Sequence, residues 1–144
     1  MAKSLVMRLA LTGLLAGMVL ATIDLALYGE VLKAPMADAM RALPKPRMLG
    51  LLVPWYVSLD LIAGVGLMWL YAAMRTRFGA KRSTAVIAGA AGWFFAILLP
   101  NLVQWPMNLM PLGLTATIIL VALVQWPLAV MVGARFYPRE SHVS

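Results

Sequence analysis

Two aspartates, Asp24 and Asp60, stand inside long apolar runs, where an ionisable side chain is costly. A carboxylate at the centre of a membrane-spanning helix costs on the order of 3 kcal/mol even on lenient insertion scales, so such residues face a protein interior or a water-filled cavity. Asn101 and Gln125 place amide side chains in two later apolar runs, and Gln104 places one directly after the third run. These five residues form the candidate intramembrane polar site.

Side chains of these types in an apolar medium support three interpretations. An aspartate can hold a proton and donate a hydrogen bond to an amide or a backbone carbonyl, which would make the site a polar link between helices. The same groups could form a proton- or cation-responsive site in a small transporter or channel. A polar helix face could also dock the chain, as an accessory subunit, onto a larger membrane complex.

Catalysis and cofactor binding have less support in the residue types. Two aspartates could act as acid and base in intramembrane hydrolysis, but the local motifs of the aspartyl signal peptidases are absent around both. The sequence has no Gly-rich phosphate loop, no Ser-His-Asp set and no metal-ligand cluster. There is no cysteine, and the single histidine, His142, lies in the C-terminal tail. We therefore expect no metal, no haem and no other cofactor.

The apolar runs that carry these residues decide the fold class. Hydrophobic residues make up 63% of the 144 residues and charged residues 12%, with a mean hydropathy of +0.90, whereas a soluble domain is usually near half apolar and a quarter charged. A helix of roughly 20 mainly apolar residues crosses the hydrocarbon core. Four stretches are long enough: 5–28, 49–74, 83–103 and 112–134. The prediction is an all-α membrane protein, a four-transmembrane-helix bundle that forms one domain over residues 1–144.

The first apolar run has an alternative interpretation as a signal peptide. Lys3 and Arg8 precede the apolar stretch, which is how a signal peptide begins. Residues 19–21 (Val-Leu-Ala) are a weak cleavage site, and the run continues past them to Leu27. This length favours a retained first helix.

Small residues in three of the runs are spaced for close helix contacts. Gly13 and Gly17 form a GxxxG pattern, which lets two helix backbones approach each other. This face could form a dimer or pack against another helix of the same chain, and the low specificity of the pattern favours the second. Gly64, Gly89 and Gly92 are the expected packing positions in the second and third runs.

The first loop, residues 30–47, carries apolar residues at helical spacing. Leu32, Met36, Met40 and Leu43 recur with charged residues between them. The pattern predicts a short interfacial helix lying on the membrane surface. An ordered loop without a helix fits the same residues almost as well.

The charges predict both the partner and the orientation. The formal net charge is +7, and because the basic residues flank apolar runs we expect a lipid bilayer with anionic headgroups as partner rather than nucleic acid. Loops rich in Lys and Arg face the cytoplasm. Eight such residues lie in the N-terminal segment, second loop and tail, and four in the other loops: Lys3, Arg8, Arg75, Arg77, Lys81, Arg82, Arg135 and Arg139, against Lys33, Arg41, Lys45 and Arg47. Both termini are predicted to be cytoplasmic.

Residues 69–79 (Trp-Leu-Tyr-Ala-Ala-Met-Arg-Thr-Arg-Phe-Gly) and 84–89 (Thr-Ala-Val-Ile-Ala-Gly) resemble a small family of uncharacterised bacterial inner-membrane proteins. The similarity runs through all four spans. It includes an acidic residue late in the first helix, usually glutamate in the family and Asp24 here. The shorter side chain reduces the reach of the acid and keeps its charge. The resemblance implies a multi-pass protein of the bacterial inner membrane and says nothing about mechanism, because the family has no established activity.

Taken together, these patterns predict a multi-pass membrane protein that acts as a structural or accessory component with polar helix–helix packing. The alternative is a small proton- or cation-coupled transporter or channel that uses Asp24 and Asp60. A homo-oligomer or a larger membrane complex is compatible with both.

Overall fold

The computed structural model describes residues 2–41, 43–44 and 49–138, with the backbone alone for residues 2, 3 and 49. Within these ranges the chain is helical and has no strand. Four helices are long and apolar enough to cross a membrane: Ser4–Val31, Leu52–Phe78, Arg82–Met107 and Leu112–Phe136. The predicted all-α class with four apolar spans is confirmed. His142, Lys45, Arg47 and Arg139 lie outside the described residues.

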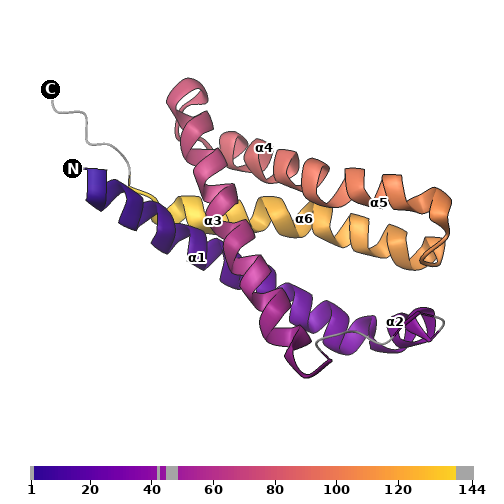
Figure 1. The fold of residues 1–144 in the computed structure, drawn as a ribbon. Coiled ribbons are helices and arrows are strands. Elements are labelled where there is room, and N and C mark those ends of the chain that lie inside the picture. Colours follow the sequence, from indigo (N-terminus) through magenta and orange to yellow (C-terminus); the bar gives the residue numbers. More distant parts are fainter. Residues whose placement is uncertain (1, 42, 45–48, 139–144) are drawn as a thin grey trace, which may run out of the picture.

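The first span consists of α1 (Ala2–Ala26) and a π-helical turn (Leu27–Val31). It crosses α3 (Leu52–Phe78), which follows a 3-10 turn at Leu49–Leu51 (Figure 1). The crossing is close because glycines lie on it. A Cβ atom built on Gly13 would come within 2.5 Å of the Cα atom of Val65, and one built on Gly64 would meet the backbone of Gly17. The GxxxG face is therefore occupied by α3 of the same chain.

Hydroxyl groups on the outer faces of these helices are bonded to their own backbone. The Thr22 hydroxyl donates to the carbonyl oxygen of Met18 over 2.7 Å, and the Ser58 hydroxyl donates to that of Pro54 over 2.7 Å. A polar side chain without a partner is costly where no water is present, and a bond to the preceding turn removes that cost. These residues are consequently compatible with an apolar medium.

The first loop contains a short helix, α2 (Lys33–Met40). The residue before it, Leu32, is buried with Leu27 and Leu114, and Met36 packs against this group from α2. The helix is therefore held against the beginning of α6 (Leu112–Phe136). Its position on a membrane surface stays a prediction.

Gly79 ends α3 with a φ of +80°, a conformation that a side chain disfavours. The chain then reverses into α4 (Arg82–Trp93), where the Thr84 hydroxyl donates to the Gly79 carbonyl oxygen over 2.9 Å. This bond joins the two sides of the turn. The basic segment between α3 and α4 is thus a tight, ordered reversal.

The third span changes helix type just before Pro100. After α4, a π-helical turn (Phe94–Leu98) leads into α5 (Leu99–Gln104), and a 3-10 turn (Trp105–Met107) ends the span. Proline lacks the N–H that an α-helix needs and clashes with the carbonyl one turn earlier, and a wider turn removes that clash. The span therefore continues through Pro100 and ends beyond residue 103, at Met107, and the next residue, Asn108, lies in the left-handed region.

The fourth span, α6, packs alongside α4 at two glycines. A Cβ atom built on Gly89 would come within 2.6 Å of the backbone nitrogen of Pro127, and one on Gly92 would come within 3.1 Å of the Trp126 ring. The Trp93 indole donates to the carbonyl oxygen of Ile119 over 3.0 Å. α4 and α6 form a second closely packed pair, next to the pair of α1 and α3.

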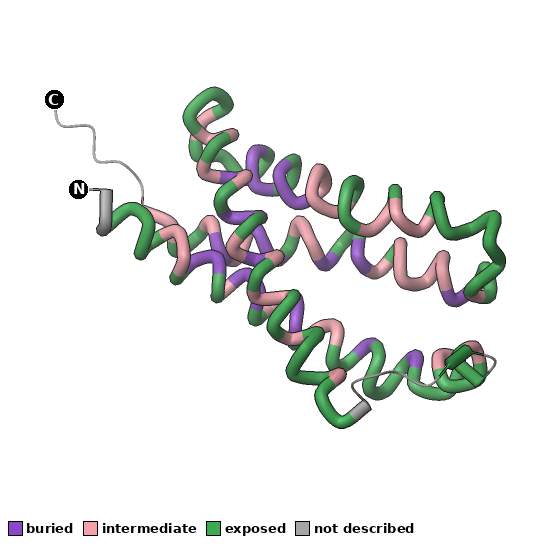
Figure 2. The backbone as a smooth tube through the Cα atoms, viewed as in Figure 1, coloured by how far each residue is buried: buried purple, intermediate pink, exposed green. Residues whose placement is uncertain are grey.

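The buried residues gather where α1, α3 and α6 meet, with the first part of α4 beside them (Figure 2). The third span is the least buried of the four, and large apolar side chains such as Phe95 and Val103 are exposed on it. Monomeric soluble proteins rarely expose a continuous apolar surface of this kind. The exposed surface is thus compatible with contact to lipid.

Candidate functional site

Gln125 joins two helices from a buried position in the middle of α6. Its side chain is only 3% exposed. The two N–H bonds of its amide group are both used: Nε2 donates to the Asp24 Oδ1 atom over 2.8 Å and to the Leu20 carbonyl oxygen over 3.1 Å. Leu20 and Asp24 are one turn apart on α1, so a single amide spans that turn. This contact connects α6 to α1.

Asp60 extends the connection to α3. Its carboxyl group hydrogen-bonds with that of Asp24. An ionised carboxylate only accepts hydrogen bonds, so a bond between two carboxyl groups needs a proton on one of them. We call Asp24, Asp60 and Gln125 the polar centre. It brings together one side chain from each of α1, α3 and α6.

The crossing of α1 and α3 explains why these two aspartates meet. A Cβ atom built on Gly17 would come within 2.7 Å of the Asp60 backbone oxygen. Asp24 lies seven residues beyond Gly17, which is two helical turns and therefore the same face of α1. The Asp60 side chain can reach along that face to Asp24. Without the glycine the two backbones would separate and the carboxyl groups would move apart.

Tyr28 lies one turn beyond Asp24 on the same face of the first span. It is close enough to Asp24, Asp60 and Tyr56 to interact with each electrostatically, and it is 37% exposed. The sequence places Tyr28 on this face, but its residue type gave no reason to include it in the polar site. The backbone carbonyl of Leu20 was also missed, since no sequence pattern reports which carbonyl a side chain will meet.

Asn101 and Gln104 lie elsewhere. The Asn101 amide donates to the carbonyl oxygen of Ile97 over 2.8 Å, one turn earlier in the same span. Gln104 is exposed at the end of α5. Among the described residues, neither hydrogen-bonds to the polar centre. The candidate site of five residues therefore separates into a group of three and two amides on the third span.

The chemistry open to the polar centre is hydrogen bonding and proton binding. Among the described residues, no buried side-chain nitrogen or oxygen lacks a hydrogen-bond partner. In the same part of the chain, no group of three or more acidic or histidine side chains could hold a metal ion. A recess of about 360 Å³ lies beside Gln125 between α1 and α6, but its other lining residues are apolar and neither aspartate reaches it.

Comparison of the chain with protein-family models, with curated proteins and with solved structures finds no match in any of the three. The resemblance to a family of bacterial inner-membrane proteins is not tested by these comparisons and stays a prediction. The function therefore has to be argued from the geometry of the residues.

Proposed function

We propose that this chain is a multi-pass membrane protein of the structural or accessory kind, in which the polar centre links three membrane-spanning helices. The observation that carries the proposal is the pair of hydrogen bonds from the buried Gln125 amide to Asp24 and Leu20. The four apolar helices are compatible with membrane insertion. Within the hydrocarbon core an amide or carboxyl group needs a hydrogen-bond partner. Here the Gln125 amide and the two carboxyl groups are such partners for one another.

Two features favour a link between helices over a transport site. Both hydrogens of the Gln125 amide are already bound, so none is left for a ligand. The recess beside Gln125 has no polar lining apart from that residue. Transport sites are expected to line a polar cavity that water or an ion can enter. The geometry thus supports a structural role.

A proton-coupled transporter is the second candidate, and one observation favours it. Asp24 and Asp60 hydrogen-bond to each other, and neither side chain is fully buried. A pair of carboxyl groups that shares one proton can release it and take it up again. Alternating proton occupancy at such a pair is a recognised element of proton-driven transport.

The variants Asp60→Asn and Asp60→Leu separate the two candidates. Asparagine keeps the shape and can donate a hydrogen bond to Asp24, so in a structural link it leaves thermal stability nearly unchanged, whereas leucine lowers it. In a transporter, asparagine abolishes proton-dependent flux in proteoliposomes while the protein remains folded. Retained stability with no flux in either the wild-type protein or the variant supports the structural role. Proton-linked flux that Asp60→Asn removes would overturn it.

We further propose a bacterial inner membrane as the location, with both termini in the cytoplasm. The start of α1 and the end of α6 lie at the same end of the molecule, together with the basic turn between α3 and α4 (Figure 1). This arrangement agrees with the excess of Lys and Arg counted over those segments. A reporter fused after Ser144 should be active only in the cytoplasm, and activity in the periplasm would contradict the orientation.

The accessory interpretation needs a partner or a second copy. The GxxxG face cannot serve as a dimer interface, because α3 occupies it. The third span is the least buried of the four. Gentle detergent extraction should yield either a reproducible heteromeric complex, as expected for an accessory subunit, or a homo-oligomer. A homogeneous monomer would contradict the accessory interpretation and leave a structural role without a partner.

A further inference from the structure

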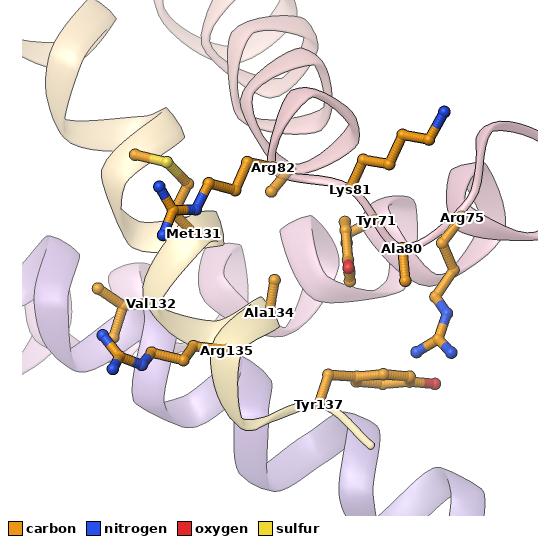
Figure 3. A pocket seen from close by; sticks show the side chains of 11 residues that line it. Tyr71, Arg75, Ala80, Lys81, Arg82, Met131, Val132, Ala134, Arg135 and Tyr137 are labelled. Carbon is orange, nitrogen blue, oxygen red and sulfur yellow. The ribbon is translucent and has the colours of Figure 1, made fainter. Parts of the chain in front are cut away.

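A cavity of about 500 Å³ lies at the basic end of the bundle, away from the polar centre. It is open on one side and is lined by the end of α3, the start of α4 and the end of α6 (Figure 3). Four of its lining residues are cationic: Arg75, Lys81, Arg82 and Arg135. The volume is in the range of small-molecule sites. Three segments that are far apart in the sequence thus place positive charge around one cavity.

The positive charge in this cavity is not neutralised by the described part of the protein. None of the lining residues is acidic. Among the described residues the one ion pair within 4.0 Å joins Arg41 and Asp38, in and just after α2. Like charges held close together raise the energy of the folded chain unless an anion lies between them. The positive electrostatic potential in the cavity therefore favours the binding of an anion.

One wall of the cavity is formed by contacts between α3 and the end of the described chain. The Arg75 guanidinium group donates to the Pro138 carbonyl oxygen over 2.9 Å and lies 4.8 Å from the centre of the Tyr137 ring. That ring meets Tyr71 edge-on at 6.2 Å. Figure 3 shows Arg75 on this side, with the guanidinium groups of Arg82 and Arg135 on the other. The contacts fix Arg75 and leave Arg82 and Arg135 without a carboxylate partner among the described residues.

The beginning of α4 adds to the positive potential. The helix starts at Arg82, and the preceding residue, Lys81, makes no side-chain cap. The first backbone N–H groups of a helix have no acceptor within the helix, and the helix dipole favours an anion there. Phosphate groups bind at such helix ends when cationic side chains are also present.

Apart from Tyr71 and Tyr137, the other lining residues are apolar and include Met131 and Val132 of α6. A site with cations at the end of apolar spans lies at the depth of the lipid headgroups. The planar guanidinium group of an arginine can donate two parallel hydrogen bonds to the oxygens of a phosphate. We propose that this cavity binds the phosphate of an anionic phospholipid headgroup, with Arg82 and Arg135 as the main contacts and the acyl chains lying along the apolar surface of α6.

The proposal depends on the membrane insertion proposed above and is tested separately from it. The full-length protein is purified in a neutral detergent and titrated with phosphatidylglycerol or phosphatidylcholine while bound lipid is measured by native mass spectrometry. Phosphatidylglycerol is expected to bind at least about tenfold more tightly, because the zwitterionic lipid carries no net negative charge. Equal binding of the two lipids would overturn the proposal.

The double variant Arg82→Gln/Arg135→Gln removes two charges from the cavity. The matched control Arg8→Gln/Arg77→Gln removes two charges from exposed positions at the same end that do not line it. We expect the first to weaken phosphatidylglycerol binding by about tenfold or more and the control by less than about threefold. Equal losses would show that overall charge attracts the lipid, and would overturn a specific site.

A third titration uses inorganic phosphate, which shares the anion and lacks the acyl chains. Weak binding of inorganic phosphate, which at millimolar concentration displaces little phosphatidylglycerol, supports a lipid as the natural source of the bound phosphate group. Tight binding that displaces phosphatidylglycerol would assign the cavity to a soluble phosphate compound and overturn the lipid source. If the chain instead stays monodisperse in buffer without detergent, membrane insertion fails while the affinity for inorganic phosphate can still be measured.

Discussion

The Gln125 amide donates a hydrogen bond of 2.8 Å to the Asp24 carboxylate, across 101 positions of sequence and between the last and first of the four long apolar helices. Asp60 brings in α3 through its hydrogen bond with Asp24. Three helices that otherwise meet through small and apolar side chains thus share one polar contact. In a medium without water such a contact favours one rotation of each helix about its axis, because every other rotation leaves a polar group facing lipid.

Replacing Gln125 by leucine should destabilise the protein by about 1–2 kcal/mol. The change removes both hydrogen bonds of the amide and leaves Asp24 short of a donor, and interhelical hydrogen bonds in membranes contribute amounts of this order. The free energy of unfolding is measured by denaturant titration in micelles. The matched control is Gln104→Leu, at an exposed position, where a change below about 0.5 kcal/mol is expected. Equal effects of the two variants would contradict a specific role for Gln125.

Alanine at Gly64 should lower stability by about 1–3 kcal/mol, the usual cost of forcing extra volume into a packed contact. Its methyl group would meet the backbone of Gly17 on α1. Gly66 is the matched control, because nothing lies within 4 Å of a Cβ atom built there. Gly66→Ala should leave stability unchanged or raise it slightly, since alanine favours a helix more than glycine does. Thermal unfolding in detergent checks both variants, and a stable Gly64→Ala protein would refute the close crossing.

Removing the Tyr137 ring should cost about 1–2 kcal/mol. Tyr137→Ala loses the cation–π contact with Arg75 and the edge-on contact with Tyr71, each of which contributes roughly 1 kcal/mol. Phe136→Ala, next in the chain but 65% exposed, is the control and should change stability little. The unfolding midpoint in detergent measures the difference. If Phe136→Ala is as harmful as Tyr137→Ala, the aromatic contacts do not hold the end of α6.

Leu32→Ala should loosen α2 without unfolding the bundle. Leu32 is 6% exposed and packs with Leu27 and Leu114, so truncation leaves a cavity in the contact that holds the loop. Hydrogen exchange of the α2 amides should rise about tenfold or more, since a tenfold change needs only about 1.4 kcal/mol of local stability. Leu43→Ala, at a residue that is 42% exposed, should leave the exchange unchanged. Unaltered exchange in Leu32→Ala would mean that α2 does not depend on α6.

The four spans could be located from the sequence because the length of an apolar run is a local property. A run of about 20 apolar residues identifies a helix long enough to cross a membrane whatever its neighbours are. The costly polar residues within the runs, Asp24, Asp60 and Gln125, could be singled out for the same reason. Five glycines of the helix contacts also stood out, since small residues in an apolar helix are spaced by the helical period. Gly133 of α6 was missed, although a Cβ atom built there would come within 2.9 Å of the Thr12 backbone oxygen on α1.

Which polar residues meet was decided only by the tertiary structure. The rotation of each helix about its axis depends on contacts between segments, such as that of Gly17 with α3. The sequence of one helix does not specify how its neighbour is rotated. Asn101 follows a π-helical turn that shifts its direction, and its amide meets Ile97 in its own span. The basic cavity also needed three segments in place, since Arg82 and Arg135 are far apart in the sequence and converge only when α4 and α6 pack side by side. The composition and the hydrophobic period of a segment can be read from that segment alone. Whether residues of different segments meet depends on how the helices pack against each other.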